Sequence, residues 1–103
     1  MMKQLLPVGS VVYLQEGSTP AVIIGLGQLV PLLEGEQASY FDYCGTIYPE
    51  GITPETTFYF NHEDIAKVIF TGYESEQHTR YLEAVEEWKA ANANSFVVGK
   101  VGG

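Results

Sequence analysis

The chain has 103 residues, 46% of them hydrophobic and 13% aromatic, which is enough apolar material for one domain with a modest core. Five basic residues face thirteen acidic ones, and the net charge of -8 excludes nucleic acid and anionic membranes as expected partners, since both need a basic footprint. The single cysteine excludes an intrachain disulfide, and no apolar run approaches the roughly 18 residues of a membrane span.

The first part of the chain predicts short β-strands separated by turns. Two runs of β-branched residues flank the turn cluster 16–20, and this pattern predicts a hairpin. Segment 28–38 stays open as a third strand, an edge strand or a loop, because Pro31 interrupts its apolar residues. The predicted strands cover residues 11–15, 21–26, 39–48, 56–60 and 67–70.

Two helical segments are expected after the fourth strand. Asn61 can cap a short helical turn near residues 61–66, which returns at once to β-prone residues. Ser75 can cap one long helix over residues 75–92. That helix has an apolar stripe at helical spacing, which we assign to the core: Tyr81, Leu82, Val85 and Trp88.

Strands first and a long helix last predict an α+β fold. We expect a small curled antiparallel β-sheet of four to six strands, with the short helical turn near 61–66 and the C-terminal α-helix packed on the sheet. Residues 1–94 form the single domain in this interpretation. Residues 95–103 form a C-terminal tail that is either a strand or flexible.

The residues that could support catalysis or metal binding do not form a convincing site. His62, Glu63 and Asp64 are adjacent, so they cannot all face one ion, and no second histidine has the spacing of a zinc site. Cys44 could pair with a histidine, but a lone cysteine is more often a small core residue. We therefore expect no enzyme, no cofactor and no metal.

Acidic and aromatic residues instead predict a surface that binds another protein. No Lys or Arg occurs between Lys3 and Lys67, and such an acidic field favours a basic partner. The alternatives are that the acids serve solubility and that the aromatics stabilise the sheet across strands. The candidate protein-binding residues are Tyr40, Asp42, Tyr43, Tyr48, Glu50, Tyr59, His62, Glu63, Asp64 and Tyr73.

Four sequence blocks carry a resemblance to a known family. They are LLPVGSVV at residues 5–12, YFDYCGTIYPEG at 40–51, FNHEDI at 60–65 and VIFTGY at 68–73. In this order they resemble the family called domain of unknown function 4176, from Gram-positive bacteria, over about residues 5–82. The chain departs from the family pattern after Asn92.

The resemblance implies a role in type VII secretion, because that family is found in such gene clusters near toxins with an N-terminal LXG domain. It implies a small accessory protein that binds an LXG toxin or its export-targeting module as a chaperone or adaptor. The N-terminus lacks the pattern of a signal peptide, so we expect a cytoplasmic protein. The alternative is an immunity protein that neutralises a toxin domain; an enzyme that uses His62, Glu63 and Asp64 is a third hypothesis.

Overall fold

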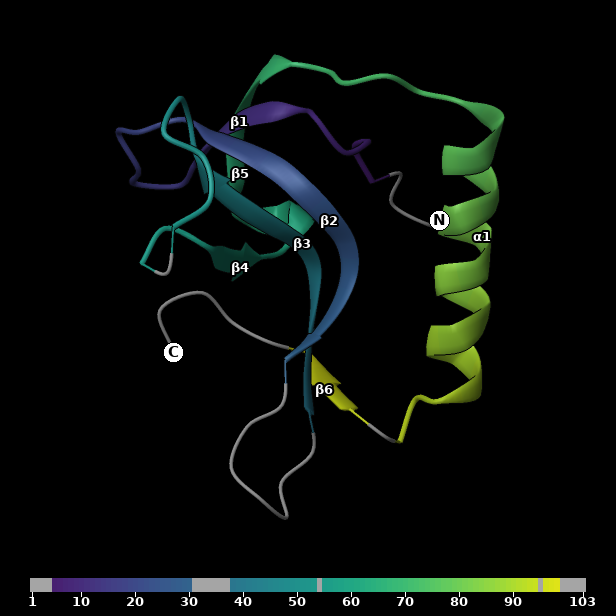
Figure 1. Ribbon diagram of the computed structural model, residues 1–103. Coiled ribbons are helices and arrows are strands. Elements are labelled where there is room, and N and C mark those ends of the chain that lie inside the picture. The colour runs from purple at the N-terminus through teal and green to yellow at the C-terminus, as the bar shows by residue number, and fades with distance from the viewer. Residues whose placement is uncertain (1–4, 31–37, 54, 95, 99–103) are drawn as a thin grey trace.

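A computed structural model describes residues 5–30, 38–53, 55–94 and 96–98, and within them it confirms the predicted α+β class (Figure 1). The strands are β1 (Val11–Leu14), β2 (Ala21–Val30), β3 (Ala38–Ile47), β4 (Phe58–Phe60), β5 (Ile65–Phe70) and β6 (Phe96–Val98). A 3₁₀ turn, η1, covers His62–Asp64, and the helix α1 covers Glu76–Ala91. Of segment 28–38, residues 28–30 extend β2 and Ala38 begins β3, whereas 31–37 lie outside the described residues.

The sheet has the strand order β4-β3-β2-β1-β5, with all neighbours antiparallel. β4 and β5 are therefore opposite edges, yet the single turn η1 connects them. Because so short a link can join the two edges only if they lie close together in space, the sheet must be curled, as predicted. β6 adds one parallel pairing at the start of β3, with Ala38 opposite Phe96 and Tyr40 opposite Val98.

The core lies inside the curl of the sheet. Its buried apolar residues include Val12, Ile23 and Tyr43, and the Tyr43 ring packs against that of Phe60 at 5.2 Å between centroids. Gly45 leaves room for this packing, because a Cβ there would lie 2.8 Å from Cε1 of Phe60. The core is therefore built mainly by strands that are close in sequence, with Phe60 contributed by β4.

Buried polar contacts tie η1 to β3. The Asn61 backbone N–H donates to Oδ2 of Asp64 at 2.8 Å, which is one half of a capping box. The Asp42 N–H donates to Oδ1 of Asn61 at 3.0 Å, and the His62 N–H donates to Oδ2 of Asp42 at 2.9 Å. The predicted helical turn is confirmed, and these bonds fix it against the middle of the sheet.

The edge strand β5 pairs irregularly with β1. The partner of Val11 is Phe70 and the partner of Val12 is Val68, so Ile69 is an extra residue. A second register shift near the start of β5 makes Ala66 extra in the same way. These two bulges accompany a strand in which every residue after Ile65 is exposed.

Helix α1 begins after Ser75, whose side chain accepts a hydrogen bond from the His78 N–H at 3.2 Å, as its sequence predicts. Figure 1 shows the helix beside the curved β2 strand, and the helix has no fully buried residue. Leu82 and Val85 are half-buried, whereas Tyr81 and Trp88 are 47% and 38% exposed. The core assignment is therefore wrong for Tyr81 and Trp88. In the described residues no helix has the length and apolarity needed to cross a membrane.

Candidate functional site

Three of the ten candidate binding residues are buried, which corrects their expected exposure. Tyr40, Asp42 and Tyr43 lie on β3, a central strand that is covered on both faces. The Asp42 carboxylate accepts a hydrogen bond from the His62 N–H, and Tyr43 belongs to the core cluster. These three side chains therefore cannot form an exposed docking surface in this structure.

Tyr43 and His62 show how closely this region is tied to the fold. The Leu6 N–H donates to the Tyr43 hydroxyl at 2.9 Å, and that hydroxyl lies 2.7 Å from Nδ1 of His62. Burial raises the pKa of Tyr43 to about 12, so the hydroxyl is neutral and can donate to Nδ1. His62 thus has a structural contact, and it is half-buried like Asp64.

The other five candidates are exposed but come from four separate segments. Tyr48 and Glu50 lie in the turn after β3, Tyr59 lies on β4, and Glu63 lies in η1. Tyr73, in the link between β5 and α1, is 83% exposed. Of the ten, Tyr73 and the buried Tyr40 line a hollow of the surface described below.

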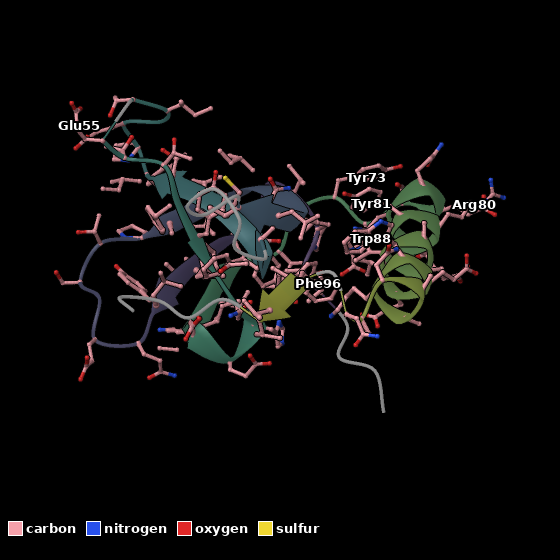
Figure 2. All side chains as sticks on the ribbon, turned by 90° about the horizontal axis from the view of Figure 1, so that it is seen from below. Glu55, Tyr73, Arg80, Tyr81, Trp88 and Phe96 are labelled. Atoms are coloured by element: carbon pink, nitrogen blue, oxygen red, sulfur yellow. The ribbon has the colours of Figure 1, made fainter. Side chains whose placement is uncertain are left out.

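That hollow is a groove between α1 and the sheet, in two sections that meet at Tyr81. The first section has a volume of about 500 Å³ and extends from Tyr81 to Tyr73 and Val8. The second has a volume of about 360 Å³ and is lined mostly by apolar groups: Gly27, Leu29, Tyr40, Tyr81, Ala84, Val85 and Trp88. Figure 2 shows Tyr73, Tyr81 and Trp88 in a row on the side of α1 that faces the sheet. We call this the helix–sheet groove.

Two hydrogen-bond contacts and one close approach of the backbone position α1 against the sheet beside the groove. The Tyr81 hydroxyl donates to the Leu26 carbonyl at 2.9 Å, and Nε2 of His78 lies 3.2 Å from the Leu5 carbonyl. Gly27 adopts the positive φ of 61° and lets the helix approach, since a Cβ there would lie 3.1 Å from Cγ2 of Val85. The groove is thus a space between these points of contact.

The floor of the second section contains a buried hydroxyl without a partner. Tyr40 is 2% exposed, and its Oη makes no hydrogen bond in the described structure. A Cβ at Gly27 would lie 3.7 Å from this oxygen, so the hydroxyl is next to the groove-lining Gly27. Burial, and then the charges of Asp42 and Glu86, raise the pKa of Tyr40 well above its usual value. The neutral hydroxyl is therefore an unused donor and acceptor.

An aromatic cluster closes the end of the groove at β6. The Phe96 ring lies 5.4 Å from that of Tyr40 and 5.4 Å from that of Trp88, on which it stacks. Nζ of Lys89 lies 4.5 Å from the centroid of the Tyr40 ring, in a cation–π arrangement. These contacts join α1, β3 and β6, and they orient Trp88 in the groove wall.

The charges of α1 are mostly negative. Glu76 pairs with Arg80 at 3.1 Å, which neutralises both side chains. Glu87 is exposed and has no ion-pair partner among the described residues. No group of three or more residues suited to hold a metal occurs in the described part of the chain. The groove can therefore offer apolar contacts and hydrogen bonds, within a domain of net charge -8.

Sequence reasoning missed the groove because it assigned the helix stripe to the core. One signal was available: the stripe contains Tyr81 and Trp88, whose polar ends suit a half-exposed wall better than leucine does. Leu29 and Gly27 had no such signal, because the path of β2 beyond Leu26 was left open. Their role follows only from the tertiary arrangement.

Comparisons with known proteins found one similarity. The family model described as "Domain of unknown function (DUF4176)" matches residues 5–81 of this chain. No curated protein and no solved structure matches it. The matched region includes the whole sheet except β6, and it ends inside α1 at Tyr81.

Proposed function

Because the chain belongs to the DUF4176 family, for which no function is defined, we propose a function from its surface: it binds another protein and performs no catalysis. The observation that carries this proposal is the helix–sheet groove, an open apolar hollow with exposed Tyr73, Tyr81 and Trp88 on its wall. Tyrosine and tryptophan are the residues that most often anchor protein interfaces. The net charge of -8 adds attraction for a basic partner.

The partner that we propose is an LXG-type toxin of a type VII secretion system, or the module that targets it for export. In this role the protein acts in the cytoplasm as a chaperone or adaptor, before its partner is secreted. The support is the association that the family resemblance implies, together with a surface suited to protein binding. A chaperone of this kind needs an exposed apolar surface that covers a partner's own apolar residues before export.

Co-expression with the LXG toxin of the same gene cluster tests this proposal. We expect one complex by gel filtration, and we expect Tyr81→Ala with Trp88→Ala to weaken it by about 100-fold or more, because two interface aromatics are removed. Tyr48→Ala is a matched control, since Tyr48 is an exposed tyrosine outside the groove. Absence of a complex with every product of the gene cluster would reject the proposed function.

An immunity protein is the second candidate, and the acidic charge is the observation that favours it. Toxin domains that attack nucleic acids are often basic, so an acidic domain could cover them. The two candidates differ in which end of the toxin is bound. A chaperone should bind the N-terminal export region, whereas an immunity protein should bind the C-terminal toxic domain and rescue growth of cells that express it.

A further inference from the structure

The unpartnered hydroxyl of Tyr40 is the starting point, because buried polar groups in folded proteins nearly always have a partner. Its ring is held on two sides by Phe96 and Lys89, so the hydroxyl cannot swing out to water without losing these contacts. In the described residues the indole N–H of Trp88 also makes no hydrogen bond. The second section of the helix–sheet groove therefore contains two donors that an occupant could use.

These donors distinguish between an extended and a helical occupant. A helix uses its own carbonyls internally, and along its sides it presents almost none to a partner. An extended segment leaves its carbonyls free, so hydroxyl and indole donors in an aromatic groove can bind them. The groove follows α1 from Ser75 to Trp88, about 20 Å at 1.5 Å per residue. An extended segment of about six residues has the same length.

Charge determines the second property of the occupant. The chain has a net charge of -8, and Glu86 and Asp42 add negative charge near Tyr40. Glu86 is paired with Lys89 at 3.8 Å, so the attraction comes from the acidic field of the whole domain and not from one carboxylate. This field favours an occupant with a Lys or Arg, whereas a second copy of this acidic chain would be repelled.

We propose that the helix–sheet groove holds an extended, apolar segment of a partner protein that carries at least one Lys or Arg. Its apolar side chains lie against Tyr81 and Trp88. One of its backbone carbonyls accepts a hydrogen bond from the Tyr40 hydroxyl, and the acidic field of the domain attracts its basic side chain. This inference rests on the proposed function only in that the partner is a protein; it adds where and in what conformation the partner binds.

Selection from a library of linear 12-residue peptides, with the whole protein as bait, tests the inference. We expect enriched sequences with β-branched residues or proline, which disfavour helices, and with a Lys or Arg. Synthetic copies of these peptides can be titrated against the protein, with the fluorescence of Trp88 as the readout. Trp88 is the only tryptophan of the chain, so the signal reports on the groove.

One variant of the protein and one of the peptide measure the contacts. Tyr40→Phe removes only the hydroxyl and should weaken peptide binding about 3- to 10-fold, the effect of one hydrogen bond. Replacing the Lys or Arg of the peptide by Gln should weaken binding about 2- to 5-fold at low salt and reduce the salt dependence of the affinity. Tyr48→Phe is the matched control for Tyr40→Phe, because Tyr48 is an exposed tyrosine outside the groove; it should leave the affinity unchanged.

Several results would overturn the inference. Examples are enrichment of helix-forming amphipathic peptides, enrichment of no class, or peptides whose affinity is unaffected both by Tyr40→Phe and by loss of the basic residue of the peptide. A dimer in sedimentation that is lost in Trp88→Ala would identify a second copy as the occupant instead. If the toxin complex forms but is insensitive to Tyr40→Phe, the inference fails while the proposed function stands. If peptides bind as expected but no toxin complex forms, the proposed function fails instead.

Discussion

Replacing Tyr40 by phenylalanine should make the protein more stable. The hydroxyl that is lost is buried and unpartnered, whereas the ring keeps its contacts with Phe96 and Lys89. A buried polar group without a partner costs about 1–3 kcal/mol, and the small void left by the oxygen offsets part of the gain. We expect the free energy of unfolding to rise by about 1 kcal/mol, which corresponds to roughly 4 °C in Tm.

Urea denaturation followed by the fluorescence of Trp88 measures this change, and Tyr81→Phe provides the comparison. The Tyr81 hydroxyl has a partner, the Leu26 carbonyl at 2.9 Å, so its loss should lower the free energy of unfolding by about 0.5–1.5 kcal/mol. The two substitutions remove the same atom, yet the expected changes in the free energy of unfolding have opposite signs. A loss of stability in Tyr40→Phe as large as that in Tyr81→Phe would refute the reasoning, because the Tyr40 hydroxyl would then have a partner in solution.

Three further predictions concern the sheet. Burial raises the pKa of Tyr43 to about 12 and that of Tyr40 further, so both hydroxyls keep their protons in the folded protein, whereas the unfolded chain loses them near pH 10. The free energy of unfolding should therefore be unaffected by these groups below pH 10 and fall above it, by up to about 1.4 kcal/mol per pH unit for each group. Urea midpoints that stay constant from pH 9 to 11 would contradict this prediction. Gly45→Ala should cost about 1–3 kcal/mol in urea denaturation because its Cβ meets a core ring, and a cost below about 0.5 kcal/mol would show that the core yields easily. Asp42→Ala should cost about 1–3 kcal/mol because the His62 N–H loses its buried acceptor; a thermal melt measures it, and an unchanged Tm would mean that water replaces the carboxylate.

Local sequence signals predicted most of the secondary structure. The capping residues Asn61 and Ser75 predicted the start of both helical segments, and the turn after β1 predicted the first hairpin. β6 could not be assigned in the same way. Its three residues pair with β3, more than fifty positions away in the sequence, and no local pattern reports such a contact.

The candidate site was only partly predictable. Tyr73 was chosen as one of the acidic and aromatic candidates, and the structure places it, 83% exposed, at the groove. Tyr40 was identified for the wrong reason, as an exposed anchor, whereas it is the buried floor of the groove. Helical periodicity finds which residues of α1 face the sheet, but it cannot tell how closely the two surfaces approach. That distance determines whether Trp88 fills a core or lines a groove.

The two bulges of β5 have a consequence for how the protein behaves at high concentration. β5 exposes Val68, Ile69 and Phe70 at an edge of the sheet, a combination that in a regular strand would recruit strands of other molecules. The extra residues Ala66 and Ile69 space its outward amide and carbonyl groups unevenly, and Lys67 adds a charge between them. A neighbouring molecule therefore cannot continue the ladder in register. We therefore expect the irregular pairing to hinder edge-to-edge assembly of this acidic domain, although β5 exposes apolar side chains.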